Sequence, residues 1–81
     1  MSKKPKNICG ERLRIARLRK KMQQIDVTVA LEDYDITLNQ TAIGKIERGE
    51  RNIFDFELLA FSKFLEVAVE WLQKGGDFKI G

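Results

Sequence analysis

The sequence lacks the residue types on which several common kinds of functional site depend. It contains no histidine and a single cysteine, Cys9, so an internal disulfide and the usual Cys/His zinc site are both excluded. General-base catalysis by histidine is excluded as well. The sequence also has no phosphate-cradling glycine loop and no acidic pair that its pattern assigns to a cleft. We therefore expect neither an enzyme nor a bound metal or cofactor.

Proline and long apolar runs are also scarce. No apolar stretch approaches the roughly 20 residues of a membrane span, and no signal-peptide core follows the basic start, so we expect a cytoplasmic protein. The only proline, Pro5, lies in residues 1–7, which we expect to form a flexible basic arm. The rest of the composition, with 43% hydrophobic and 33% charged residues in a chain of 81, is typical of one small folded domain.

Positive charge is concentrated at the start of the chain. Residues 1–21 contain nine Lys or Arg and one acidic residue, whereas residues 22–38 contain four acidic residues and no basic residue. A basic segment in a chain of net charge +3 favours a polyanionic partner. A basic terminus that only increases solubility would show the same distribution.

Apolar residues recur at helical spacing and predict an all-α fold of five helices. Four of the expected helices span about residues 8–21, 24–33, 40–48 and 68–73, and the other, the fourth along the chain, starts within residues 54–57 and continues through Leu65. In the turn before the third helix, Asp35 is expected to adopt a left-handed conformation. At the start of the fourth helix, Asp55 is expected to be the N-cap, with Phe54 and Leu59 forming a hydrophobic staple across it.

The segment LNQTAIGKIERGER, residues 38–51, is the most informative part of the sequence. Asn39 suits a helix N-cap, and Gly49 suits the left-handed position that ends a helix. The apolar seam between them consists of Ala42, Ile43 and Ile46. The other side carries amides, a hydroxyl and a cation, which are the groups that pair with base edges in a DNA major groove, although an ordinary exposed helix would look similar.

Gly44 lies in the middle of this third helix, where glycine costs about 1 kcal/mol relative to alanine. Either this cost is incidental, or a side chain at this position would clash with a close neighbour such as the wall of a DNA groove. The sequence leaves both explanations open.

These features resemble the lambdoid-repressor family of helix-turn-helix DNA-binding domains, which includes phage repressors and Cro. The resemblance covers about residues 8–74. It is carried by Leu13, Arg14 and Arg17, by Gln24, Val27 and Thr28, and by residues 41–51, 55–58 and 69–72. The stretch between the second and third helices is longer than in the commonest family pattern, as in one branch of the family.

The resemblance implies a compact five-helix domain whose third helix enters the major groove. It implies base contacts by Asn39, Gln40, Thr41 and Lys45. It implies phosphate contacts by Arg14, Gln24, Arg51 and Asn52. It also implies a structural ion pair between Arg17 and Glu47, which would join the first helix to the third. Residues 75–81 would form a C-terminal tail.

The first functional hypothesis is therefore sequence-specific binding of double-stranded DNA by a transcriptional regulator, expected to be a repressor. We expect it to act as a homodimer on a two-fold operator. The candidate dimer contacts, which could equally complete the monomer core, are Trp71, Phe78 and Ile80.

The alternative hypothesis is a protein-interaction module of the same fold, such as an antitoxin or a bridging factor, with weak or non-specific DNA binding. It is motivated by apolar residues at positions where polar ones are expected. These residues are Ile15, Ile25 and Val29.

Overall fold

The computed structural model describes residues 8–74, and this part of the chain forms five α-helices and no strand. The helices are α1 (Ile8–Arg19), α2 (Gln24–Glu32), α3 (Gln40–Glu47), α4 (Asp55–Leu65) and α5 (Val69–Lys74). The expected all-α fold of five helices is therefore confirmed. The expected basic arm, residues 1–7, and the expected tail, residues 75–81, lie outside the described residues.

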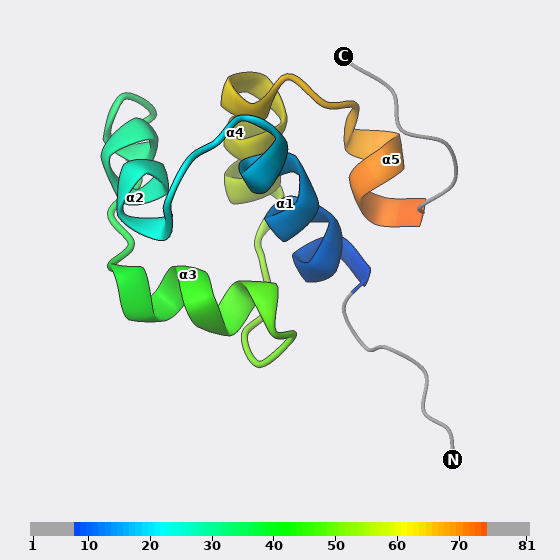
Figure 1. The fold of residues 1–81 in the computed structure, drawn as a ribbon, viewed down its shortest axis with the longest axis horizontal. Helices are drawn as coiled ribbons and strands as arrows, with labels where there is room; N and C mark the ends of the chain where they lie inside the picture. The colour runs from blue at the N-terminus through cyan, green and yellow to red at the C-terminus, as the bar shows by residue number, and fades with distance from the viewer. Residues whose placement is uncertain (1–7, 75–81) are drawn as a thin grey trace.

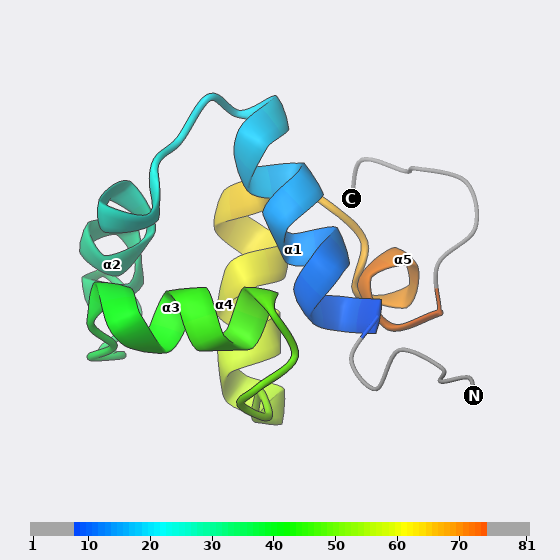
Figure 2. The ribbon, with the colours of Figure 1, turned by 60° about the horizontal axis from the view of Figure 1, so that its bottom comes forward.

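Helix α1 occupies the middle of the molecule, where it contacts α3, α4 and α5 (Figures 1 and 2). Helix α2 packs against α3 and α4. Helix α3 runs along one edge, with its first turn below α2 and its last turn below α1 in Figure 1. No other helix covers the outer side of α3 in either view. The packing therefore fixes α3 from behind and leaves its other side to solvent.

The core is one cluster to which every helix contributes. It contains Leu13 and Ala16 of α1, Val27 and Leu31 of α2, Ile43 and Ile46 of α3, Leu58, Ala60, Phe61 and Leu65 of α4, and Trp71 and Leu72 of α5, together with Ile36 and Val67. Of the three residues expected in the apolar seam of α3, Ile43 and Ile46 are confirmed as core residues, each 1% exposed, whereas Ala42 is only partly buried and lies outside this cluster.

The segments that flank α3 behave as the sequence predicts. Asp35 adopts a left-handed conformation with φ 61°, and Ile36 beside it is buried and anchors the long turn. Asn39 is the N-cap, because its side-chain oxygen accepts a hydrogen bond from the Ala42 N–H at 2.8 Å. Gly49, with φ 78°, follows the C-cap in the left-handed conformation that ends the helix.

The start of α4 differs from the prediction. Asp55 is the first helical residue, and the N-cap is Phe54, whose N–H donates to Glu57 Oε1 at 3.0 Å. This shift by one residue removes the register that a staple between Phe54 and Leu59 requires. Phe54 instead stacks on Phe56, with ring centroids 6.0 Å apart. The prediction was wrong because it weighed the capping preference of aspartate and overlooked the carboxylate of Glu57 as an acceptor for this N–H.

Three helices also end slightly earlier than expected, and one of them is α3, which ends at Glu47 with Arg48 as its C-cap. Helix α1 ends at Arg19 because Lys21 adopts a left-handed conformation with φ 59°, and α2 ends at Glu32. Trp71, a candidate for the dimer contact, is 4% exposed and completes the monomer core. The other two candidates, Phe78 and Ile80, lie outside the described residues.

Candidate nucleic-acid interface

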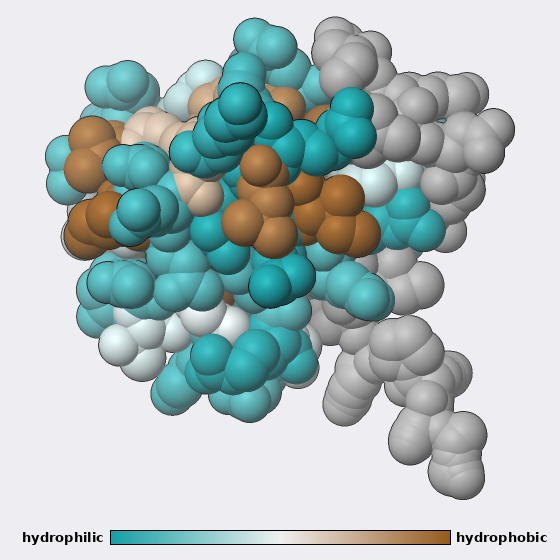
Figure 3. All heavy atoms as spheres, viewed as in Figure 1, coloured by the Kyte–Doolittle hydropathy of each residue, from teal (hydrophilic) through white to brown (hydrophobic). Residues whose placement is uncertain are grey.

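The outer side of α3 carries the four side chains expected to read bases. Gln40, Thr41 and Lys45 are exposed because helical spacing turns them away from Ile43 and Ile46, and Asn39 is exposed at the N-cap. Figure 3 shows hydrophilic atoms over α3, whereas apolar atoms gather over α1 and α2. The exposed apolar residues of α1 and α2 include the three behind the protein-interaction alternative, Ile15, Ile25 and Val29.

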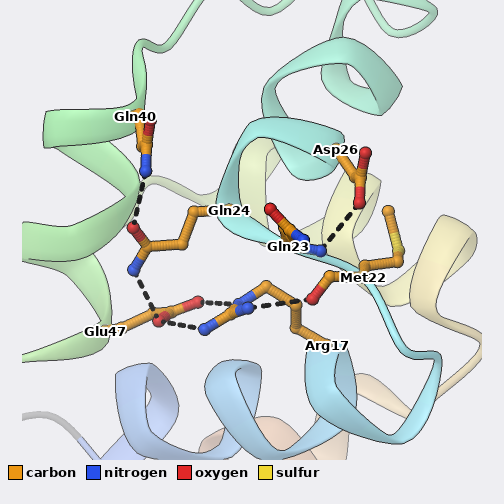
Figure 4. Close-up of polar contacts among 7 residues, drawn as sticks. All are labelled: Arg17, Met22, Gln23, Gln24, Asp26, Gln40 and Glu47. Carbon is orange, nitrogen blue, oxygen red and sulfur yellow. Dashed lines mark hydrogen bonds and ion pairs between the residues drawn. The ribbon is translucent and has the colours of Figure 1, made fainter.

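A bidentate ion pair joins α1 to the end of α3. Arg17 Nε donates to Glu47 Oε2 at 2.6 Å, and Arg17 Nη2 donates to Glu47 Oε1 at 3.0 Å (Figure 4). The two side chains are only 9% and 5% exposed. Arg17 Nη1 also donates to the Met22 carbonyl at 2.9 Å, just before α2. Because bidentate arginine–carboxylate pairs impose a fixed geometry, Arg17 fixes the end of α3 relative to α1 and to the start of α2.

Gln24 extends this polar chain to the start of α3. Its Nε2 donates to Glu47 Oε1 at 3.1 Å, and its Oε1 accepts from Gln40 Nε2 at 3.5 Å (Figure 4). The structure therefore brings Gln24, Gln40 and Glu47 together. The link through Gln24 was not predicted, because it depends on how α2 crosses α3, which sequence spacing does not reveal.

An open hollow of about 280 Å³ lies between the start of α2 and the side of α3. It is lined by Gln24, Gln40, Thr41, Gly44 and Arg48. A Cβ at Gly44 would lie 3.1 Å from Arg48 Nη1 and 3.7 Å from Gln24 Nε2. The absence of a side chain at Gly44 therefore lets two side chains of the protein itself, Arg48 and Gln24, lie close to the backbone of α3. The wall of a DNA groove is thus not the only close neighbour that can account for this glycine.

Arg48 is a residue of this surface that sequence reasoning missed. Its Nε and Nη2 donate to the two carboxylate oxygens of Glu50 at 3.1 and 3.2 Å. This hydrogen bonding raises the pKa of Arg48 and lowers the pKa of Glu50. The signal in the sequence was the cation that directly precedes Gly49 at the end of the third helix. Arg48 therefore offers a guanidinium to the hollow while Glu50 orients it.

The expected phosphate contacts have different environments. Arg14 is exposed on α1 and does not line the hollow, and Asn52 is exposed in the loop after α3. Arg51 donates through Nη1 and Nη2 to the two oxygens of Glu57, both at 3.1 Å, and through Nη1 to the Asn52 carbonyl at 2.8 Å. Because Glu57 is only 3% exposed, Arg51 has a structural role that the sequence did not reveal.

Within residues 8–74, no group of three or more His, Cys, Asp or Glu side chains could hold a metal ion. In the same part of the chain, no helix has the length and apolar character needed to cross a membrane.

The solved structures that are similar to this chain include two regulatory proteins. One is the P22 c2 repressor in complex with a synthetic operator in the presence of Tl⁺. It is 31% identical, with a TM-score of 0.72, over 84% of this chain and 96% of that chain. The other is the restriction-modification controller protein C.AhdI from Aeromonas hydrophila. It is 29% identical, with a TM-score of 0.62, over 80% of this chain and 91% of that chain. No protein-family model and no curated protein matches the chain.

Proposed function

Because this chain belongs to the Cro/C1-type helix-turn-helix family of DNA-binding proteins, we propose that it is a transcriptional repressor that binds double-stranded DNA by sequence. In this proposal α3 enters the major groove and residues 8–74 form the DNA-binding unit. The observation that carries the proposal is the exposed polar side of α3, which the Arg17–Glu47 pair and Gln24 hold in place. The 31% identity to a repressor in complex with its operator supports it.

Base recognition falls to the exposed side chains of α3. Gln40 and Lys45 offer donors to purine acceptors, and Thr41 offers a hydroxyl or its methyl group. The Asn39 side-chain oxygen already accepts a hydrogen bond from the Ala42 N–H. The NH₂ group of the same side chain remains for the bases, and it can bind only to acceptor atoms on them. A good bidentate base contact is worth about 1–3 kcal/mol of discrimination.

Phosphate contacts fall to Arg14, Gln24, Arg51 and Asn52. Gln24 is the first residue of α2, where the unpaired backbone N–H groups of a helix attract anions. A homodimer would place two such domains on half-sites about one helical turn of DNA apart.

The first test is fluorescence anisotropy with duplexes selected from a random pool and with the unselected pool, from about 50 to 200 mM salt. We expect a preference of about 10³ or more for the selected duplexes, and it should persist at the higher salt. Binding to both pools that disappears together as salt rises would contradict sequence reading. It would favour the interaction-module alternative with non-specific DNA binding.

Substitutions at two exposed cations, Lys45 and Arg14, distinguish a contact to a base from a contact to a phosphate. Lys45→Ala should relax selection at one base position, with a loss of about 1–3 kcal/mol for the selected duplex only. Arg14→Ala should weaken selected and random duplexes alike and reduce the salt slope by about one. Arg14 is a better probe than Arg51, because Arg51→Ala would also remove the only cation that the structure shows bonded to the buried carboxylate of Glu57 within residues 8–74. Equal losses on both kinds of duplex for Lys45→Ala would contradict its assigned role.

A further inference from the structure

The outer side of α4 is an exposed apolar surface that the proposed DNA contacts do not use. Phe56 and Leu59 are 60% and 53% exposed. Helical spacing places them on one side of α4 with three polar residues. This surface, here called the α4 face, consists of Asp55, Phe56, Leu59, Ser62 and Lys63. Leu59 lies at its centre, and Asp55 and Lys63 are exposed at its two ends.

The aromatic edge of the α4 face is already ordered. Phe54, 56% exposed, stacks on Phe56 with the two rings only 2° from parallel, and the Arg51 guanidinium lies 5.7 Å from the Phe54 ring centroid. Arg51 is itself held by Glu57. Large apolar side chains that are fixed before binding lose little conformational entropy when they become covered, which favours a contact surface.

We propose that the α4 face pairs with the α4 face of a second copy of this chain, in an antiparallel contact centred on Leu59. In a two-fold arrangement about Leu59, each residue faces the one equally far from Leu59 on the other side. Asp55 and Lys63 lie four residues before and four after Leu59, so each carboxylate meets an ammonium of the other copy. Phe56 meets Ser62, which is small enough to leave room for the ring.

The charge pattern is the reason to choose a second copy over another partner. A surface with an acid at one end, a base at the other and an apolar centre is complementary to itself when reversed. The last turn of α3 is joined by a short loop to the start of α4, as Figure 2 shows, so an antiparallel pair places the two α3 helices toward opposite ends of the contact. The α4 contact itself does not depend on the proposed function. Only its purpose does, because a DNA site made of two half-sites requires two α3 helices held together.

Sedimentation equilibrium of the complete chain without DNA tests the contact. Asp55→Lys and Lys63→Asp should each weaken self-association by about tenfold, because each change places like charges together at two symmetric positions. The double variant should restore it. An equimolar mixture of the two single variants should associate more tightly than either alone, because all the facing charges are then opposite. Circular dichroism establishes that each variant is folded.

Glu70→Lys is the matched control. It reverses an exposed acidic residue in the first turn of α5, as Asp55→Lys does in the first turn of α4, but it lies off the α4 face. It should leave self-association unchanged. A monomeric wild type, or a double variant that associates no better than the single ones, would overturn the proposal. A chain that self-associates in this charge-dependent way but ignores selected DNA would support the α4 contact and refute the proposed function.

Discussion

At the scale of single residues, the pairing of Arg17 with Glu47 dominates the polar interior. Neither side chain has much access to water, so each charge depends on the other for its solvation. Removing one member leaves a buried charge without compensation, which costs far more than the net value of the pair. The geometry that the resemblance implied for these two residues is present, and the structure adds Met22 and Gln24 as further partners.

Replacing Glu47 tests this dependence. Glu47→Gln keeps the shape of the side chain but strands the Arg17 charge, so we expect the free energy of unfolding in urea to fall by about 3–5 kcal/mol. Glu50→Gln is the control, because Glu50 forms a comparable pair with Arg48 in which the side chains are more than half exposed. The control should change stability little. Similar losses for both variants would argue against a special role for burial.

Cys9 provides a pH-dependent test. Burial raises the pKa of the Cys9 thiol from 9.0 to about 11. Since the folded pKa lies above the unfolded one, the stabilising contribution is fully present below pH 9 and is lost as pH rises through about 11. We expect wild type to lose on the order of 1 kcal/mol more than Cys9→Ala over this range, measured by urea unfolding. Parallel losses in the two proteins would show that other groups cause the decline.

At the scale of the element, α3 shows why its central glycine matters. Gly44→Ala should gain up to about 1 kcal/mol of helix propensity. The added Cβ would approach the flexible end of the Arg48 side chain, which can move away at little cost. That movement would disturb the hollow, so we expect unchanged or higher thermal stability together with about tenfold weaker binding to selected DNA, the scale of one base contact.

A second glycine provides the comparison for Gly44→Ala. Gly49 has φ 78°, where a Cβ is strained, so Gly49→Ala should lower stability by about 1–2 kcal/mol. Both proteins would be compared by thermal unfolding and by fluorescence anisotropy. If Gly44→Ala lost stability as Gly49→Ala does and still bound selected DNA normally, the glycine would serve folding alone.

The elements also show which features a sequence can predict. Seams such as Ile43 with Ile46 follow from helical spacing, and the N-cap role of Asn39 follows from local chemistry. The start of α4 did not follow, because it depends on Glu57, which accepts from the Phe54 N–H and also binds Arg51. Local preference is therefore a weak guide to a helix start where a side chain of the first turn accepts from a different backbone N–H and shifts the cap.

At the scale of the whole molecule, the all-α architecture was predictable because every helix has an apolar side that must be buried. The relative placement of the helices was not. The contact of Gln24 with Glu47 joins residues 23 positions apart, and Arg48 lines the hollow only because α2 crosses near α3. The burial of Trp71 likewise depends on α5 packing against α1, and it removed one candidate for the dimer contact.

The two ends of α3 are held by contacts of different strength, so the helix can act as a lever. Its last turn is fixed by the buried, bidentate pair with Arg17, whereas its first turn is held to α2 by the exposed 3.5 Å hydrogen bond from Gln40 to Gln24. A helix rises about 1.5 Å per residue along its axis, so the axial separation from Glu47 is about 12 Å for Asn39 and about 3 Å for Lys45. Any small rotation about the fixed end therefore displaces Asn39 about four times as far as Lys45. In the proposed complex, positional error grows toward the start of α3, so the sharpest discrimination between bases falls at Lys45.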